Sequence, residues 1–391
     1  MTSIMRGEER PISLAIYLPD LSGGGAERLH VNLAPQFVKA GYSVTFLLDR
    51  LVGSLLSQLP QGCAVHALGA DRQIRALPKL VRYLKRTRPD VLIANMEHMN
   101  VMAVLARALA RVPTRIIAIQ HCALSEQVRR PSLKFRVLPL LFRLVLPFAD
   151  NIVAVSIGVA DDLAQIAGLS RSKITVIYNG VVSSDFEARL ACEPEHPWFA
   201  QGWPIILGMG RFVAQKDFTT LIRAFEHVAQ VSDDARLIIL GEGPMRAELQ
   251  EHVRSLRSLS DRISMPGFLA DPLPLLGRAR LFALSSRFEG FGNVVAEALA
   301  CGTPVVSTDC PHGPAEILDR GRYGALVPVG NAEALGRAIL EALNREPDRM
   351  ALIKRGQMFS VPRCAREYGR LIEGCKARVS SRGQVTEQAQ A

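Results

Sequence analysis

Short apolar runs rich in Val, Ile and Leu alternate with helical stretches from one end of this 391-residue chain to the other. Runs of this kind form strands buried on both faces, as in parallel sheets covered by helices on each side. The expected strands are 12–18, 43–48, 64–68, 90–95, 115–120, 151–156, 174–178, 204–210, 236–241, 262–267, 280–285, 303–308 and 324–329. The pattern therefore predicts an α/β fold with doubly wound, Rossmann-like parallel sheets.

The alternation breaks once, between Val182 and Trp203, where the sequence has the composition of a loop. A chain of this length exceeds one ordinary domain, so we expect two domains that face each other across a cleft. Ligands of such sheets bind beyond the carboxyl ends of the strands. The expected parts are an N-terminal domain over 1–185, a C-terminal domain over 186–361, a helix over 362–375 that crosses back to the first domain, and a disordered polar tail over 376–391.

Cysteine usage and hydropathy favour a cytoplasmic chain. The seven cysteines are odd in number, widely spaced and without a C-x-x-C pair, which argues for reduced thiols and against zinc or a disulfide framework. No apolar stretch reaches the length of a spanning helix. The run Ile12–Leu18 is short and follows two glutamates, so we interpret it as a strand rather than a signal peptide. With no D-x-D or H-E-x-x-H motif, we expect no metal site.

The net charge of +10 is concentrated in the first half, where residues 1–190 carry +9 and residues 191–391 carry +1. Segments 71–90 and 128–148 mix cations with apolar residues at helical spacing, and Pro78 marks a possible helix start in the first of them. Such segments favour reversible binding to an anionic membrane surface, here the inner face of the cell membrane. Membrane binding has two alternatives. The apolar residues of these segments can face the protein core, and the positive charge of the first half can lack any binding partner. Nucleic acid is not expected, because aromatic residues make up 6% and no binding motif occurs.

A glycine turn, Gly23–Gly25, follows the first expected strand and precedes a helix that begins near Ala26. Glycines allow close approach to the backbone, and a helix N-terminus favours an anion. A dinucleotide fingerprint would need a small residue at Arg28, although Asp49 stands where the ribose-binding acid would be. The turn therefore predicts a phosphate contact, with a ligand-free turn as the alternative.

Two carboxylates, Glu289 and Glu297, flank a glycine loop that opens a helix near Gly292. A carboxylate can accept from vicinal hydroxyls, and the loop amides and helix dipole favour phosphate between them. Arg211 and Lys216 follow another strand and supply cations, or are simply surface residues. The arrangement predicts a nucleotide diphosphate sugar as ligand, with ribose, diphosphate and hexose in that order.

Taken together, these motifs resemble family 4 of the retaining glycosyltransferases with the GT-B fold. The E-x7-E pair is Glu289–Glu297, and the basic pair is Arg211 and Lys216. Stretches that resemble the subgroup building lipopolysaccharide and other envelope glycans are Ser307–Leu318 and Tyr323–Asn331, while Gly241–Pro244, "GGGAER" and Tyr178–Val181 also fit the family. The resemblance covers roughly residues 12–375. His312 and Ala315 depart from the subgroup pattern and leave the sugar's identity open.

The resemblance implies a role for each site residue. The implied catalytic residues are Glu289, which would bind the donor sugar's hydroxyls, and His121, which would face that sugar, with His98 as an alternative to His121. Glu297 would bind the ribose, and the backbone near Phe268 would bind the base. The implied donor-binding residues are Gly24, Gly25, Arg211, Lys216, Phe268, Gly290, Phe291, Gly292, Asn293 and Glu297.

The implied reaction moves a hexose or N-acetylhexosamine from a nucleotide sugar, with UDP as the expected nucleotide, to a lipid-linked or lipopolysaccharide-type glycan. It would proceed with retention and without cofactor or metal, the leaving phosphate assisting deprotonation of the acceptor. An epimerase or a phosphorylase on the same fold and an NAD-dependent oxidoreductase remain alternatives. A catalytically silent membrane scaffold would be expected to lose Glu289, Arg211 or Lys216, which are all present.

Overall fold

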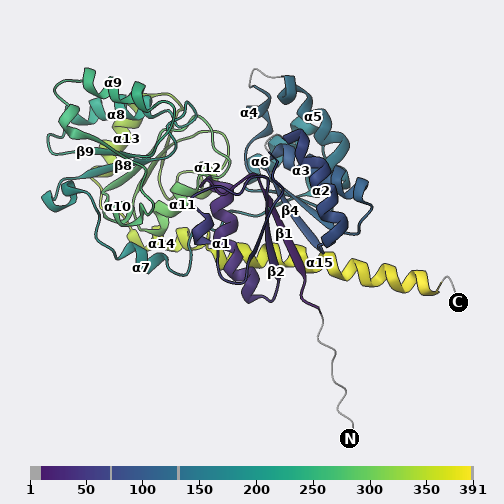
Figure 1. Cartoon of the computed structure of the whole chain (residues 1–391). Helices are drawn as coiled ribbons and strands as arrows, with labels where there is room; N and C mark the ends of the chain where they lie inside the picture. The colour runs from purple at the N-terminus through teal and green to yellow at the C-terminus, as the bar shows by residue number, and fades with distance from the viewer. Residues whose placement is uncertain (1–9, 71–72, 130–132, 389–391) are drawn as a thin grey trace, which may run out of the picture. The chain divides into compact units, whose positions relative to one another are not determined.

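The computed structural model, which describes residues 10–70, 73–129 and 133–388, forms two compact units (Figure 1). The chain passes between them four times, after Ala154, Asp161, Ile177 and Arg363. The first unit comprises Met1–Ala154, Asp162–Ile177 and Cys364–Ala391, and the second comprises Val155–Asp161 and Tyr178–Arg363.

The first unit is built on a parallel sheet whose described strands have the order β3-β2-β1-β4-β5-β6-β7. The strands are β1 (Ser13–Leu18), β2 (Ser43–Leu48), β3 (Ala64–Ala67), β4 (Val91–Asn95), β5 (Arg115–Gln120), β6 (Asn151–Ala154) and β7 (Ile174–Val176). β1 pairs with β2 on one side and with β4 on the other. The order therefore reverses between β1 and β4, and the carboxyl ends of these two strands frame a topological switch point.

Helices pack on this sheet through their apolar sides. They are α1 (Gly25–Lys39), α2 (Gln73–Thr87), α3 (Glu97–Ala110), α4 (Leu124–Val128), α5 (Leu133–Val145) and α6 (Ile157–Ala167), with 3-10 turns η1 (Leu56–Gln58), η2 (Leu146–Phe148) and η3 (Arg171–Lys173). The start of α6, up to Asp161, belongs to the second unit. In α2, Leu80 and Leu84 are fully buried, while Lys85 is exposed. The helix begins five residues before Pro78, so that proline is not its start. Burial of its apolar side compensates for the one backbone bond that the proline removes.

The second unit repeats the design with described strands in the order β10-β9-β8-β11-β12-β13, all parallel. These strands are β8 (Ile205–Met209), β9 (Arg236–Leu240), β10 (Ile263–Gly267), β11 (Leu281–Leu284), β12 (Val305–Thr308) and β13 (Ala325–Val327). The helices are α7 (Phe186–Leu190), α8 (Phe218–Ala229), α9 (Arg246–Ser255), α10 (Leu273–Arg278), α11 (Asn293–Ala300), α12 (Pro314–Ile317), α13 (Ala332–Leu343) and α14 (Arg349–Gln357), with 3-10 turns η4 (Pro197–Gln201) and η5 (Ser260–Arg262). Its switch point lies between β8 and β11.

The predicted α/β class with two parallel sheets is confirmed, and each of the thirteen expected strands is present. The largest difference is at the end of the chain. The last helix, α15 (Val361–Gln388), continues well beyond residue 375, where we expected the helix to give way to a disordered tail. A helix that has already nucleated gains one backbone bond for each residue added, so the Ala, Arg, Lys, Gln and Glu of this stretch can extend it.

Candidate functional site

Two loops meet at the switch point of the second sheet, one after β8 and one after β11. They are joined by three hydrogen bonds: the Arg287 amide donates to the Gln215 carbonyl (2.8 Å), the Gln215 side chain to the Phe288 carbonyl (2.9 Å), and the Ser285 hydroxyl to the Lys216 carbonyl (2.8 Å). Residues far apart in the sequence are thus held in a fixed arrangement at the carboxyl ends of the two strands.

Lys216 and Glu289 form an ion pair at the centre of this site. The ammonium of Lys216 lies 2.6 Å from Oε1 of Glu289, and the hydroxyl of Ser286 donates to the same oxygen at 2.6 Å. The side chain of Glu289 is 7% exposed and that of Lys216 is 16% exposed. Because Oε1 of Glu289 already accepts from both Lys216 and Ser286, Oε2 is left to accept from a ligand. Burial, together with the Glu289 charge, also raises the pKa of the neighbouring Cys310 thiol to about 12.

The glycine loop that precedes α11 leaves backbone donors available. Gly292 caps the helix with a φ of 93°, in the left-handed region that favours glycine. Within the described part of the chain, the amides of Gly290, Phe291 and Gly292 donate to no backbone carbonyl. The loop is shaped by contact with Gly313, where a Cβ would overlap the carbonyl of Phe291. These amides and the dipole of α11 can accommodate an anion.

Side chains from two other segments support this loop within the second unit. The hydroxyl of Ser156 donates to the Gly290 carbonyl at 2.7 Å, and the amide of Asn179 donates to Oδ1 of Asn293 at 2.9 Å. The rings of Tyr178 and Phe291 pack with their centroids 5.7 Å apart. Phe291 is 3% exposed, so its ring belongs to the packed interior of this unit.

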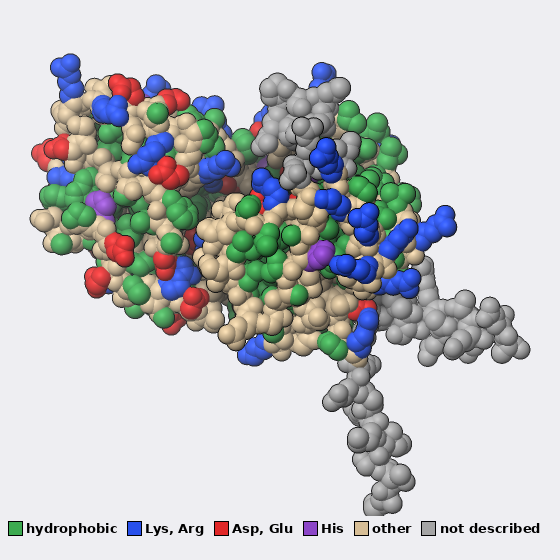
Figure 2. Space-filling view, in the orientation of Figure 1, with side chains coloured by type: hydrophobic (Ala, Val, Ile, Leu, Met, Phe, Trp, Pro, Cys, Tyr) green, Lys and Arg blue, Asp and Glu red, His purple; other side chains and the backbone are tan. Residues whose placement is uncertain are grey.

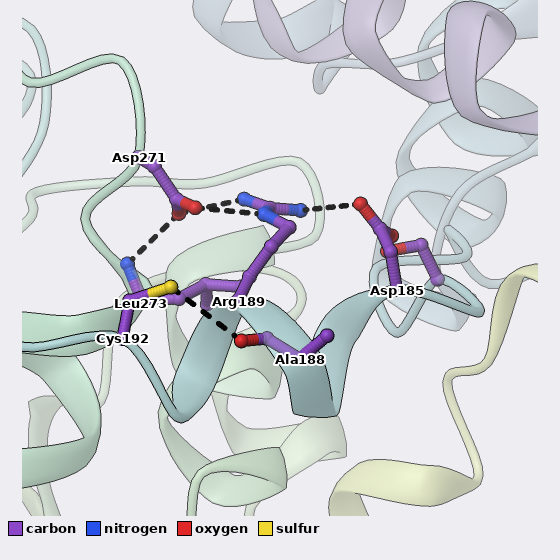
Figure 3. A network of polar contacts seen from close by, with 7 residues as sticks. Asp185, Ala188, Arg189, Cys192, Asp271 and Leu273 are labelled. Atoms are coloured by element: carbon purple, nitrogen blue, oxygen red, sulfur yellow. Dashed lines mark hydrogen bonds and ion pairs between the residues drawn. The ribbon is translucent and has the colours of Figure 1, made fainter.

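Glu297 lies one turn into α11, close to a cation that the sequence did not point to. The guanidinium of Arg189 donates to both oxygens of Asp271 at 2.9 and 2.7 Å (Figure 3). The hydrogen bond to Asp271 raises the pKa of Arg189, and the charges of Asp185 and Glu297 act in the same direction. Arg189 thus places positive charge near the carboxylate expected to bind the ribose.

The two remaining candidates of this unit are solvent-accessible. Arg211 is exposed and follows β8, and Phe268 follows β10 with 61% of its surface exposed. The exposed cation follows a strand of the switch point, and the exposed ring follows the edge strand β10. Within the described residues, the fold does not position these two side chains as it positions Lys216 and Glu289.

Near the loop that departs from the family pattern, Glu316 joins separate parts of the second unit. Its two oxygens accept from the amides of Ile157 and Gly158, each at 2.8 Å, and Oε2 also accepts from the hydroxyl of Tyr178 at 3.1 Å. Burial and the Glu316 charge raise the pKa of Tyr178 to about 12. His312 packs against Gly158, so this loop is held from both ends.

In the first unit, Gly24 caps α1 and Gly25 is its first residue, so the helix begins one position before Ala26. His121 directly follows β5, and its Nε2 lies 2.9 Å from Oδ1 of Asn95. Burial lowers the pKa of His121 to about 3, with a further contribution from the nearby His30. His98, the alternative candidate, is the second residue of α3.

The structure therefore groups the sequence candidates by unit. It assembles Lys216, Glu289 and the residues Gly290, Phe291, Gly292 and Asn293 into one network, with Glu297 one turn along α11. Gly24, Gly25 and His121 belong to the first unit. Sequence reasoning missed Asn95, His30 and Arg189, since no motif contains them. The assembled network offers a carboxylate, a cation and free amides, which suits a ligand that carries both hydroxyls and phosphate.

Comparison with known families agrees with this chemistry. The family model described as "Glycosyltransferase Family 4" matches residues 23–184, and the model described as "Glycosyl transferases group 1" matches residues 203–345. The two matches fall on the two halves of the chain and together span both sheets.

Two curated relatives align with most of the chain. The lipopolysaccharide core biosynthesis glycosyltransferase LpsE of Rhizobium meliloti is 30% identical over 351 residues, which are 88% of this chain and 93% of the relative. The N-acetylgalactosamine-N,N'-diacetylbacillosaminyl-diphospho-undecaprenol 4-alpha-N-acetylgalactosaminyltransferase of Campylobacter jejuni is 29% identical over 349 residues, 86% of this chain and 92% of that protein.

The fold is also similar to that of solved structures. The crystal structure of Anabaena HepE in complex with UDP and glucose has a TM-score of 0.75 and 22% identity, and the match covers 93% of this chain and 99% of HepE. The apo form of the lipopolysaccharide outer core galactosyltransferase WaaB has a TM-score of 0.70 at 20% identity, with 93% and 99% covered.

Proposed function

The chain belongs to the family 4 glycosyltransferases, and we propose that it moves a hexose or N-acetylhexosamine from a UDP-sugar to a lipid-linked or lipopolysaccharide-type glycan, with retention of configuration. The observation that carries the proposal is the Lys216–Glu289 pair beside the free amides that precede α11. That pair supplies one group for hydroxyls and one for phosphate at the same switch point.

Different parts of the donor molecule would contact different groups of this site. In this proposal the diphosphate contacts Lys216, Arg211 and the loop amides, and the second oxygen of Glu289 accepts from hydroxyls of the sugar. Glu297, with Arg189 nearby, would bind the ribose. UDP as the nucleotide is supported by the Anabaena HepE crystal structure, which is in complex with UDP and glucose.

The reaction would rely on positioning and charge. Two cations and the α11 dipole can neutralise the departing diphosphate, so we propose that no metal ion is needed. The departing phosphate would take the proton of the attacking acceptor hydroxyl on the same face of the sugar, which retains configuration. His121 would face the donor sugar, as a neutral group at physiological pH because its pKa is low.

The acceptor class is suggested by the relatives. The Campylobacter jejuni relative is named for an acceptor on diphospho-undecaprenol, and LpsE is named for lipopolysaccharide core synthesis. Both names describe glycans of the cell envelope that carry a lipid, and we propose an acceptor of that type for this chain.

A transfer assay tests the proposal. We expect a UDP-sugar, among UDP-, GDP- and ADP-sugars, to raise the melting temperature and to donate its sugar to a polyprenyl-diphosphate glycan or a lipopolysaccharide core. Transfer should persist in excess EDTA. Loss that magnesium restores would contradict the metal-independent site, and conversion of the donor without any acceptor would favour an epimerase instead.

The first unit carries a surface suited to lipid. Within the described residues, no helix combines the length and the apolar character needed to cross a bilayer. Figure 2 shows hydrophobic and basic side chains gathered over the part of the first unit where α2, α3 and α5 lie in Figure 1. A groove of about 450 Å³ between α3 and the end of α5 is lined by Leu105, Leu144 and Phe148, with Arg107 and Arg111.

The two basic segments differ in what they expose. The apolar residues of α2 face the core, so α2 offers lipid only its cations. In α5, Leu138 and Phe142 face the core, whereas Leu140 and Leu144 are each 58% exposed, and Phe148 beyond them is 68% exposed. Residues 71–72 and 130–132 of the expected segments lie outside the described residues. We therefore propose that α5 and η2 contact the inner face of the cell membrane, with α2 adding charge.

Liposome co-sedimentation tests this surface. Binding is expected with anionic vesicles at low salt, and it should weaken as salt rises, since each cation near the bilayer contributes about 1 kcal/mol. Replacing both Leu140 and Leu144 by Ser should lower binding about tenfold through lost apolar burial. Val231→Ser, at a 72% exposed position in the second unit, is the matched control. Equal binding to neutral and anionic vesicles, or no loss in the double variant, would contradict the proposal.

A further inference from the structure

Three polar side chains meet at the switch point of the first sheet. Asn95 is the last residue of β4, and its side-chain oxygen Oδ1 contacts two imidazoles. Nε2 of His30 lies 2.6 Å from this oxygen, and Nε2 of His121 lies 2.9 Å from it. The two rings are nearly perpendicular, with centroids 6.4 Å apart. Asn95 and His30 are fully buried and His121 is half-buried, so the cluster runs from the interior to the surface.

The orientation of the Asn95 amide follows from its third contact. Its Nδ2 donates to the backbone carbonyl of Tyr17, at 3.3 Å. A carbonyl only accepts, so the nitrogen of the amide must face Tyr17 and the oxygen must face the histidines. With both lone pairs of Oδ1 occupied, the amide has no favourable alternative position.

This orientation fixes the protons of both imidazoles. An amide oxygen cannot donate, so each Nε2 that contacts it must carry the hydrogen. In His30 the other nitrogen, Nδ1, is buried and has no partner within the described residues, as expected for an unprotonated atom rather than for an N–H donor. Burial lowers the pKa of His30 to about 4, so both rings are neutral near pH 7.

We propose that Asn95 is a positioning residue that, together with His30, holds His121 as the neutral Nε2–H tautomer and presents its Nδ1 as an acceptor for a hydroxyl of the donor sugar. This inference rests on the proposed function for the identity of the hydroxyl, but not for the tautomer. His121 then acts as a hydrogen-bond acceptor and not as an acid. The role given to Asn95 lies outside every motif that identified the family.

Other titratable groups near the cluster do not supply a countercharge to the rings. The ring of Tyr368 on α15 lies 6.4 Å from that of His30, and Tyr17 donates its hydroxyl to Asp49 at 2.8 Å. The lowered pKa values come from burial and, for His121, from His30. A carboxylate introduced at position 95 would therefore change the state of both rings.

The decisive measurement is the tautomer of His121 by long-range ¹H–¹⁵N correlation NMR of the ligand-free full chain, with His30→Asn and His121→Asn for assignment. Only the Nε2–H form is expected between pH 6 and 8. Asn95→Leu, which keeps size and branching but removes the acceptor, should give both tautomers. Its kcat should fall about tenfold while UDP affinity is unchanged, because the lost contact is to the sugar.

Two further variants make the result unambiguous. Asn95→Asp keeps the acceptor and adds a negative charge, which favours imidazolium, so the acid limb of the activity profile should move to higher pH even if Asn95→Leu fails to fold. Asn100→Leu removes another buried amide of this unit, which donates to the Ile119 carbonyl at 2.8 Å, and should alter neither tautomer nor pH profile. An Nδ1–H form in the unmodified protein, or an unchanged tautomer in Asn95→Leu and an unmoved acid limb in Asn95→Asp, would overturn the proposal. The Nε2–H form in a chain without transferase activity would instead refute the proposed function.

Discussion

Glu289→Gln is expected to lower sugar transfer about a hundredfold or more while the protein stays folded and binds UDP. In the structure, one oxygen of Glu289 accepts from Lys216 and Ser286, and in the proposed function the other accepts from the donor sugar. Each hydrogen bond to a charged group contributes about 1.5–3 kcal/mol, and the substitution weakens several at once. The loss should appear in kcat, because a group that holds the reacting sugar acts mainly in the transition state.

Initial rates with a labelled donor, together with calorimetry of UDP binding, measure this effect. Glu333→Gln is the matched control, since Glu333 is exposed and pairs with Arg337 on a helix surface. Turnover near that of the unmodified enzyme in Glu289→Gln would remove Glu289 from the proposed catalytic role. Equal losses in both variants would point to a general effect of the substitution.

Lys216→Ala should weaken UDP binding and turnover together, by about tenfold to a hundredfold each. The ammonium would meet phosphate oxygens in the ground state and in the transition state alike, so both quantities depend on it. Arg211→Ala should show the same pattern with a smaller loss, since Arg211 is exposed and not positioned by a partner like Glu289. The difference between the two variants tests whether positioning, and not charge alone, determines affinity.

Because Lys216→Ala also leaves the buried Glu289 without its cation, the melting temperature must be measured beside the affinity. Arg254→Ala removes a cation from an exposed pair with Glu251 and serves as the control. Unchanged UDP affinity in both Lys216→Ala and Arg211→Ala would exclude these cations from the diphosphate site.

The strands were predictable because a strand covered on both faces is apolar over most of its central positions. β2 and β5 match the expected ranges at both ends. The loops that carry Lys216 and Glu289 were predictable for a related reason, since each follows a strand whose carboxyl end must lie at the same edge of the sheet. The sequence contains no direct signal for the order of strands, which determines where the switch points fall.

The features that could not be predicted depend on contacts between distant residues. His30 lies on a helix, Asn95 ends a strand and His121 follows another, so nothing in their spacing shows that they share one oxygen. In α5 both sides of the helix are apolar, so periodicity could not tell the buried Phe142 from the exposed Leu144. Tertiary packing alone separates them.

The close approach of Gly313 to the carbonyl of Phe291 has an evolutionary consequence. The part of the loop that we propose faces phosphate is shaped by backbone at Gly292 and Gly313, which no other residue type can replace without moving the amides. Of its neighbours, His312 also has a positive φ, of 69°, whereas Ala315 lies in α12 and carries no such restriction. We therefore expect a lineage that changes its sugar to vary at Ala315, while the glycine-shaped loop proposed to bind the nucleotide diphosphate is retained.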